Sequence, residues 1–335
     1  MRLYTRRKFL KASSFAATSI LIPHPFISIT HILNMQQNLY DVIIIGGSYS
    51  GLSAAMALGR SLRNVLIIDA GQPCNRQTPH SHNFLTQDGK SPEEIASLAR
   101  HQVSRYETVH FRSDLVTTGI RTANGFEIGT ASGTIFHAKK LLIATGIRDL
   151  LPPIDGLSDC WGITALHCPY CHGYEVRNEP TGILANGEEG FEYAKLIAHW
   201  TNDLTVFTNG AALFTPDQLH ALHSHGIGIV ENSIQKLAHT TGHLRKIHFT
   251  DETSFPLKVL YARSSFEQHI DLHETLHYEL TEEGYIKVDA FQHTTAPDVF
   301  ACGDNTTRMR TVANAVASGA LAGMMINKAL VSEEF

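Results

Sequence analysis

Residues 41–58 read DVIIIGGSYSGLSAAMAL, an apolar run followed by a glycine-rich turn and an alanine-rich segment. Strand, turn and helix in this order are typical of a dinucleotide-binding fold. We expect Gly46 to make the turn, Gly51 to let the helix pack close to the strand, and the helix N-terminus to face a pyrophosphate. Ser48 departs from the G-x-G-x-x-G pattern, because it stands where a second glycine would let the backbone approach a phosphate.

A second apolar run supports the same interpretation. Residues 64–68 read NVLII and end at Asp69. This is roughly the spacing at which an acidic side chain accepts hydrogen bonds from an adenosine ribose. The candidate nucleotide-binding residues of this unit are Gly46, Gly47, Ser48, Gly51 and Asp69.

Two cysteines separated by two residues lie in HCPYCHG, residues 167–173. Such a pair can cycle between dithiol and disulfide, and its thiolate is the reactive species. Half of a structural zinc site is the alternative, but Cys74, Cys160 and Cys302 stand singly and no second C-x-x-C or matching histidine pair follows. The pair is therefore interpreted as a redox centre with no metal site, and His172 as a group that gives or takes protons near neutral pH.

Two further segments resemble motifs of the low-molecular-weight thioredoxin reductase family of flavoproteins. They read KLLIATG, residues 140–146, and TAPDVFACGD, residues 295–304, and the resemblance runs from about residue 40 to residue 323. It implies FAD as the cofactor and a helix over residues 310–319 whose positive N-terminus points at the pyrimidine side of the isoalloxazine. The residues that it assigns to FAD are Ala144, Thr145, Gly146, Gly303, Asp304, Thr311 and Val312.

Length and composition agree with two domains. The chain has 335 residues, of which 43% are hydrophobic and 18% charged, so it can form two ordinary cores. The family resemblance implies an α/β protein of two Rossmann-like three-layer domains and a homodimer. The FAD-binding domain is expected over residues 35–150 and 265–335, split by an inserted NAD(P)-type domain over residues 151–264 that carries the C-x-x-C.

Residues 1–34 are interpreted as a leader. Residues 5–22 read TRRKFLKASSFAATSILI, which matches a twin-arginine signal and predicts export to the periplasm. Its apolar core is too short to span a bilayer securely. The alternatives are a disordered basic tail, or a cytoplasmic protein whose translation starts at Met35. Residues 1–34 hold five basic and no acidic side chains, so their removal changes the net charge from −5 to −10, which argues against nucleic-acid binding.

The inserted domain departs from the pattern of an NADPH site. Residues 182–190 read GILANGEEG, so Ala185 replaces the first glycine, while Glu188 and Glu189 stand where phosphates would arrive. The next apolar run, residues 204–207, is followed by TNG instead of a basic cluster for a 2′-phosphate. These departures argue against NADPH and, less strongly, against NADH, and they leave the use of NAD(P)H uncertain.

A branch of the same family matches the redox segment better. Residues 168–175, CPYCHGYE, resemble the dithiol oxidases that close disulfides in epidithiodiketopiperazine and dithiolopyrrolone natural products, with electrons passing to flavin and then to oxygen. This resemblance implies that Cys168 is the outer sulfur, which meets the substrate, and that Cys171 is the inner sulfur, which faces the flavin. His172 would move protons to and from the thiols.

Residues 75–86, NRQTPHSHNFLT, also resemble that branch and are expected to lie over the flavin face. Their two histidines, His80 and His82, are candidates for proton transfer, and the alternative is that they are solvated loop residues.

Three classes of function stay open at this stage. The first is an FAD-dependent dithiol–disulfide oxidoreductase, which as an NAD(P)H-dependent enzyme would be a thioredoxin reductase. The second is an oxygen-using dithiol oxidase on the same scaffold, and the third is a non-enzymatic flavin- or metal-binding protein. The C-x-x-C argues against the third, and the eroded nicotinamide motif favours the second. The expected partner is a small dithiol or a thioredoxin-like protein.

Overall fold

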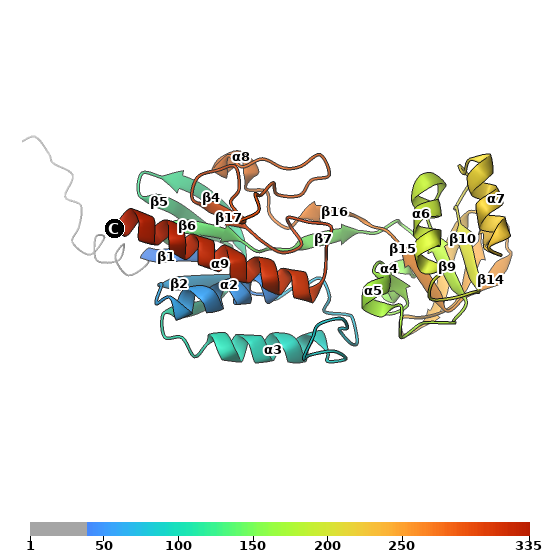
Figure 1. Cartoon of the computed structure of the whole chain (residues 1–335), viewed down its shortest axis with the longest axis horizontal. Coiled ribbons are helices and arrows are strands. Elements are labelled where there is room, and N and C mark those ends of the chain that lie inside the picture. The colour runs from blue at the N-terminus through green and yellow to red at the C-terminus, as the bar shows by residue number, and fades with distance from the viewer. Residues whose placement is uncertain (1–38) are drawn as a thin grey trace, which may run out of the picture. The chain divides into compact units, whose positions relative to one another are not determined.

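The computed structural model describes residues 39–335. The predicted twin-arginine leader and the alternative start at Met35 lie outside these residues. The described chain is an α/β protein built on one mixed and one parallel sheet, the first made from both ends of this range and the second from its middle (Figure 1).

The first sheet has seven strands in the order β3-β2-β1-β6-β5-β4, with β17 paired to β6. Pairing is parallel among β3, β2, β1, β6 and β17 and antiparallel through β4, β5 and β6. Its strands are β1 Leu39–Ile45, β2 Val65–Asp69, β3 Val109–Ser113, β4 Val116–Thr122, β5 Gly125–Thr130, β6 Ile135–Ile143 and β17 Val299–Ala301.

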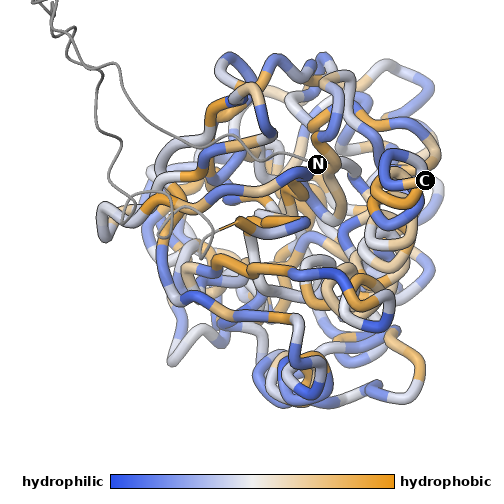
Figure 2. Tube along the Cα trace, turned by 90° about the vertical axis from the view of Figure 1, so that its left-hand side faces the viewer, coloured by the Kyte–Doolittle hydropathy of each residue, from blue (hydrophilic) through white to orange (hydrophobic). Residues whose placement is uncertain are grey.

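Alternate residues of β1 enter two different cores. Ile43 and Ile45 belong to a core on one face of the sheet, and Val42 and Ile44 to a core on the other face. All four side chains are buried, because both faces of this strand are covered. Replacing such a residue by alanine costs about 2–5 kcal/mol. Figure 2 shows hydrophobic segments along the interior strands and hydrophilic segments in the loops around them.

Three helices of more than two turns belong to this part of the chain: α2 Tyr49–Arg60, α3 Pro92–Val103 and α9 Val312–Glu334. Helices α2 and α9 lie side by side against the sheet (Figure 1). Their close approach requires small residues, since a Cβ on Gly319 would lie 2.1 Å from the backbone oxygen of Ser50, and one on Gly323 would lie 2.6 Å from that of Ala54.

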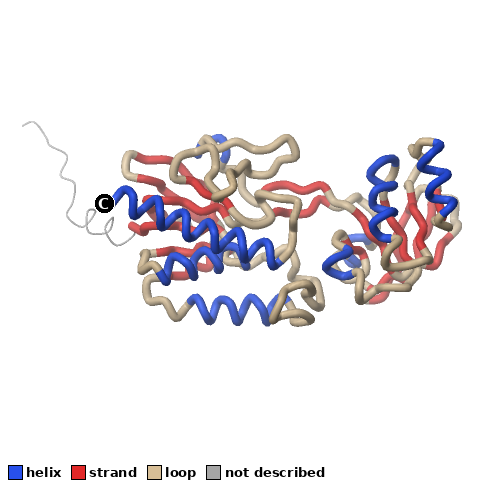
Figure 3. Tube along the Cα trace, viewed as in Figure 1, coloured by secondary structure: helices blue, strands red, loops and turns tan. Residues whose placement is uncertain are grey.

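The middle of the chain forms a second, five-stranded parallel sheet in the order β11-β10-β9-β15-β8. Figure 3 distinguishes the strands, in red, from the helices, in blue. Helices pack on one of its faces and an antiparallel three-stranded sheet on the other. The strands are β8 Ala165–Leu166, β9 Thr181–Leu184, β10 Leu204–Phe207, β11 Gly228–Val230 and β15 Val259–Ala262. The covering elements are α6 Gly187–Ile197, α7 Pro216–Ser224, β12 Ile234–Thr240, β13 His243–Phe249 and β14 Ser254–Pro256. Two short helices, α4 Leu157–Cys160 and α5 Pro169–His172, precede and follow β8 in the sequence.

The chain passes twice between the part that holds the first sheet and the part that holds the second, and the two connecting segments pair with each other. Strands β7 Ile147–Leu150 and β16 Ser265–Gln268 form a two-stranded antiparallel sheet, and the short helix α8 His273–Leu276 follows. The insertion of one α/β domain into another is therefore confirmed, and the domain limits given above stay predictions.

Helix α9 begins later than the sequence suggested. The expected helix over residues 310–319 started at Arg310, whereas the N-cap is Thr311, whose side chain accepts a hydrogen bond from the backbone nitrogen of Asn314 at 3.1 Å. A capping hydroxyl satisfies a first-turn N–H group, so it fixes the start of the helix. By length and composition alone α9 is apolar enough to cross a membrane, and its residues Ala322, Ile326 and Leu330 are fully buried in the core.

Candidate active site

The turn after β1 has the geometry that the glycine pattern predicted. Gly46 has a φ of +105°, and a Cβ there would lie 2.3 Å from the backbone oxygen of Ala144. A Cβ on Gly51 would lie 2.0 Å from the oxygen of Gly46. Only glycine fits either position, since such contacts are sterically forbidden. Ser48 is the N-cap of α2, with extended backbone and no side-chain capping bond.

A pocket opens from this turn towards the redox segment. Its empty space, counted out to open solvent, is about 1110 Å³. Nine of the residues predicted for cofactor binding or catalysis line it: Ser48, Ala144, Thr145, Gly146, Cys171, His172, Asp304, Thr311 and Val312.

The other residues predicted for cofactor binding do not line this pocket. Gly46, Gly47, Gly51 and Gly303 shape the backbone behind it; a Cβ on Gly303, whose φ is +89°, would lie 2.6 Å from the hydroxyl of Ser50. These four positions therefore set the shape of the site through close packing.

Asp69 ends β2 as expected, but it does not line the pocket. Its Oδ2 accepts a hydrogen bond from Nη2 of Arg100 on α3 at 2.8 Å. The sequence did not predict this partner. A nucleotide ribose bound at Asp69 would share the carboxylate with Arg100.

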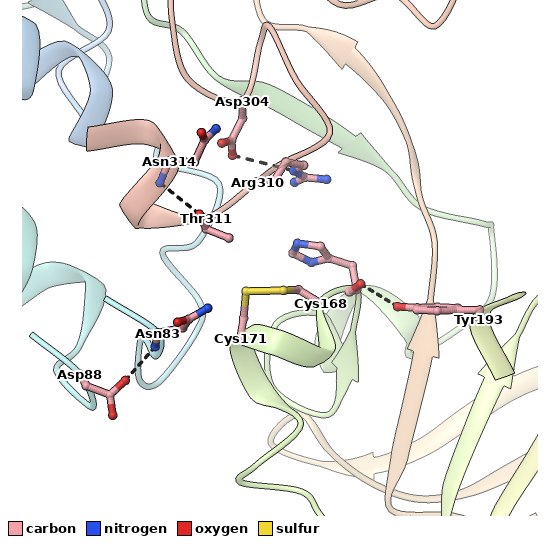
Figure 4. The surroundings of a disulfide bond; sticks show 10 residues. Asn83, Asp88, Cys168, Cys171, Tyr193, Asp304, Arg310, Thr311 and Asn314 are labelled. Carbon is pink, nitrogen blue, oxygen red and sulfur yellow. Dashed lines mark hydrogen bonds and ion pairs between the residues drawn. A yellow bond between two sulfur atoms is a disulfide. The ribbon is translucent and has the colours of Figure 1, made fainter. Parts of the chain in front are cut away.

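A buried ionic cluster lies on the α9 side of the pocket (Figure 4). Burial raises the pKa of Asp304 to about 6, although Arg310 opposes the shift. The Nε of Arg310 lies 3.8 Å from Oδ2 of Asp304, and its two terminal nitrogens hydrogen-bond to Asp149. Cys74 lies 3.8 Å from the same Asp304 oxygen, and burial raises the pKa of its thiol to about 12, so it stays protonated. Sequence reasoning missed Asp149 and the pairing of Arg310.

The cysteine pair is closed as a disulfide on the short helix α5. Cys168 is the N-cap of this helix, Pro169 follows it, and the Cα atoms of Cys168 and Cys171 are 5.3 Å apart. Proline suits the first helical position because its missing N–H would have no partner there. Cys171 lines the pocket and Cys168 does not, so the two sulfurs are inequivalent (Figure 4).

Two histidines next to the disulfide are neutral at physiological pH. Burial lowers the pKa of His172 to about 4, and His82 adds to the shift. Burial likewise lowers the pKa of His167 to about 4, and its ring stacks on Trp161 with centroids 5.9 Å apart. The expectation that His172 titrates near neutral pH therefore needs correction, because a neutral imidazole can only accept a proton from a thiol.

Of the two loop histidines, the structure places one in the pocket. His82 lines it together with Cys171 and His172, whereas His80 is exposed and lies outside. His80 instead hydrogen-bonds through Nδ1 to the backbone oxygen of Gly89 at 3.0 Å.

The phosphate position of the inserted domain is filled by its own side chains. Oδ1 of Asn186, the N-cap of α6, accepts hydrogen bonds from the backbone nitrogens of Gly187 and Leu213, both at 2.8 Å. Its Nδ2 donates to the oxygen of Ala211 at 2.9 Å, which ties residues 211–213 over the start of the helix. The N–H groups and positive end of a helix would otherwise bind a pyrophosphate.

Two carboxylates occupy the first turn of the same helix. Glu188 accepts a hydrogen bond from Gln218 at 2.5 Å, and Glu189 pairs with Arg263 at 2.9 Å. These anions already complement the helix dipole and would repel a phosphate. The residues present therefore do not fit a nicotinamide dinucleotide at this position.

The first pocket does fit FAD. Its glycine turn leaves a cradle that any Cβ would fill, and the space continues from the N-terminus of α2 past Asp304 to Cys171. Within residues 39–335, by contrast, no group of three or more His, Cys, Asp or Glu side chains is placed to hold a metal ion. A dinucleotide-binding domain that shares one pocket with a redox disulfide defines a flavoprotein disulfide oxidoreductase.

Comparison with known proteins agrees with this class. The chain belongs to the pyridine nucleotide-disulphide oxidoreductase family, whose model matches residues 40–319. It is 30% identical over 309 residues to a thioredoxin reductase of Claviceps purpurea, a match that covers 88% of this chain and 96% of that protein. The protein is an FAD-dependent disulfide oxidoreductase of the thioredoxin reductase type.

Solved structures show the same fold. The crystal structure of an oxidoreductase from Agrobacterium tumefaciens is 37% identical, with a TM-score of 0.83 over 88% of this chain and 99% of that chain. A putative thioredoxin reductase from Bacillus anthracis is 29% identical, with a TM-score of 0.85 over 88% of this chain and 100% of that chain. The resemblance to the thioredoxin reductase family inferred from the sequence is thereby confirmed.

Proposed function

We propose that this flavoprotein is a dithiol oxidase, in which electrons pass from a substrate dithiol to the Cys168–Cys171 disulfide, then to the flavin, and finally to oxygen or another carrier. One observation carries the proposal: Asn186 and the loop that it ties close the start of α6, where a nicotinamide dinucleotide would be bound. Glu188 and Glu189 add two negative charges to the same turn. Without NAD(P)H as donor, the substrate must supply the electrons.

The two cysteines would exchange with the substrate in two steps. A substrate thiolate attacks Sγ of Cys168, the disulfide breaks, and Cys171 leaves as a thiolate. The second substrate thiolate then attacks the mixed disulfide at the substrate sulfur, so the product disulfide forms and Cys168 leaves. Two electrons now reside on the cysteine pair, and of the two substrate protons one is kept by Cys168 while a base must remove the other.

His172 is placed to be that base. It is neutral, since burial lowers its pKa to about 4, and it lines the pocket beside Cys171. Bound FAD supplies the two-electron acceptor for the pair. The residues proposed to hold it are the pocket-lining members of the predicted set, Ser48, Ala144, Thr145, Gly146, Asp304, Thr311 and Val312.

A second candidate is an NAD(P)H-dependent thioredoxin reductase. Its support is the family match and the similarity to the Claviceps relative, which is named a thioredoxin reductase. In that case α6 would bind the dinucleotide after residues 211–213 moved away. The partner would be a thioredoxin-like protein, whereas the oxidase requires only a small dithiol. For either activity we propose a homodimer, exported by the twin-arginine route.

Turnover with a dithiol as the sole reductant separates the two candidates. The flavin-loaded protein, supplied with dithiothreitol in air and without nicotinamide, is expected to release one peroxide per disulfide formed. Cys171→Ser should stop this turnover, while Cys160→Ala, at a buried cysteine outside the pocket, should keep it. Peroxide or disulfide reduction that appears only when NADPH is added would instead identify a reductase.

A further inference from the structure

We propose that His82 carries protons between His172 and solvent and passes them to the exposed carboxylates of Glu175 and Asp88. The inference concerns the thiol–disulfide exchange at Cys168–Cys171, which occurs in both reaction directions. It therefore does not depend on which molecule finally takes the electrons.

The loop that carries His82 is built to hold the ring. Ser81 and Lys90 form an antiparallel bridge, with the nitrogen of Ser81 donating to the oxygen of Lys90 at 2.8 Å. Within the loop, the backbone nitrogen of Asn83 donates to Oδ1 of Asp88 at 2.7 Å (Figure 4). These bonds fix the residues on both sides of His82, whose side chain is only 19% exposed.

The ring of His82 lies between the pocket and two carboxylates. Its Nδ1 is 3.5 Å from Oε1 of Glu175, on the segment after α5, and 3.6 Å from Oδ2 of Asp88 in its own loop. Those side chains are 39% and 67% exposed, so both reach solvent. The other titratable groups near the ring are His172 in the pocket and His80, whose ring centroid is 6.5 Å away.

The exchange chemistry needs such a route. A substrate dithiol and the enzyme disulfide give a substrate disulfide, one thiol, one thiolate and one free proton. The imidazole of His172 accepts this proton poorly, because burial lowers its pKa to about 4. The proton therefore has to move on, and His82 is the titratable side chain that lines the same pocket and also contacts carboxylates at the surface.

Replacing the ring tests the proposal. In anaerobic stopped flow with dithiothreitol, His82→Asn is expected to slow flavin bleaching on the order of a hundredfold near neutral pH, at the lower end of what acid–base catalysis contributes. Added imidazole should restore much of the rate, and the dependence on dithiothreitol concentration should keep its midpoint. His80→Asn is the matched control, since His80 belongs to the same loop but lies outside the pocket.

The carboxylates give a second test at exposed positions, where the fold tolerates the change. In Glu175→Gln with Asp88→Asn neither carboxamide can take up a proton from His82, so the bleaching rate should fall in the same direction as in His82→Asn. Wild-type bleaching rates in both the His82 and the carboxylate variants would overturn the proposal. So would a slow His82→Asn that imidazole does not rescue, because that result indicates a structural role.

Discussion

Both terminal guanidinium nitrogens of Arg310 donate hydrogen bonds to Asp149, Nη1 to Oδ1 at 2.8 Å and Nη2 to Oδ2 at 3.0 Å. Asp149 lies on β7, and it also accepts hydrogen bonds from Trp161 at 3.2 Å and from Ser264 at 2.7 Å. One carboxylate thus joins the start of α9 to both ends of the inserted domain. Neither member of the ion pair is more than 13% exposed.

Asp149→Asn is expected to destabilise the protein. Removing the charge leaves the buried guanidinium of Arg310 with only Asp304, 3.8 Å from its Nε, as a counter-ion, which costs up to about 3 kcal/mol. Arg100→Gln, which breaks the more exposed pair with Asp69, should cost less than about 1 kcal/mol. Thermal unfolding of the flavin-loaded variants measures the stability of each. Equal losses of stability in Asp149→Asn and Arg100→Gln would show that the Asp149–Arg310 pair stabilises the protein no more than the Asp69–Arg100 pair.

Local sequence pattern was enough for part of this structure. The strand, turn and helix at residues 41–58 and the cysteine pair were predictable because each depends on neighbours in sequence, whereas Asp304 was predicted only through the family resemblance. The ion pair of Asp149 and Arg310 was not predictable, since 161 residues separate them and only the folded chain joins them. The Arg100 partner of Asp69 and the low pKa of His172 likewise come from tertiary packing and burial.

Asp304→Ala tests the flavin site. Loss of the charge-assisted hydrogen bonds that the carboxylate is proposed to make to bound FAD should weaken FAD binding by about 1.5–3 kcal/mol, which is roughly ten- to a hundredfold in Kd. Titration of flavin-free protein with FAD, followed by fluorescence quenching, gives the constant. The exposed Asp217→Ala serves as control, and equal FAD affinity in both variants would remove Asp304 from the site.

The roles of the two sulfurs can be assigned by spectroscopy. In Cys168→Ser the remaining thiolate of Cys171, which lines the pocket, should give a long-wavelength charge-transfer band with oxidised flavin. Cys171→Ser should not give this band. A band in the Cys171 variant alone would mean that the inner and outer roles are exchanged.

Burial of His172 should make stability depend on pH. Its pKa is lowered from 6.5 to about 4, so the folded state resists the proton that the unfolded chain takes up, and stability is lost as pH falls from 6.5 towards 4. The raised pKa of Asp304 has the opposite effect on stability, and wild type and His172→Asn share it. The drop in Tm between pH of about 7.5 and about 5 should therefore be smaller in His172→Asn than in wild type. Equal drops would contradict the burial argument.

The proposed export by the twin-arginine route is expected to depend on the arginine pair in residues 1–34. Replacing Arg6 and Arg7 by lysine should keep the protein in the cytoplasm, because the transporter recognises the arginines and not positive charge alone. Lys8→Gln, which leaves the pair intact, should still be exported. Cell fractionation reads out the result, and a wild-type protein that starts at Met35 and stays in the cytoplasm would refute export.

Stopped-flow reduction of the flavin tests the central proposal most directly. With NADPH or NADH at about ten micromolar, the flavin should stay oxidised, since each 1.4 kcal/mol of lost phosphate binding weakens affinity about tenfold. Dithiothreitol should bleach the flavin, and air should then restore its colour with release of peroxide. Bleaching by either nicotinamide within about a second would show that α6 binds the dinucleotide and that the enzyme is a reductase.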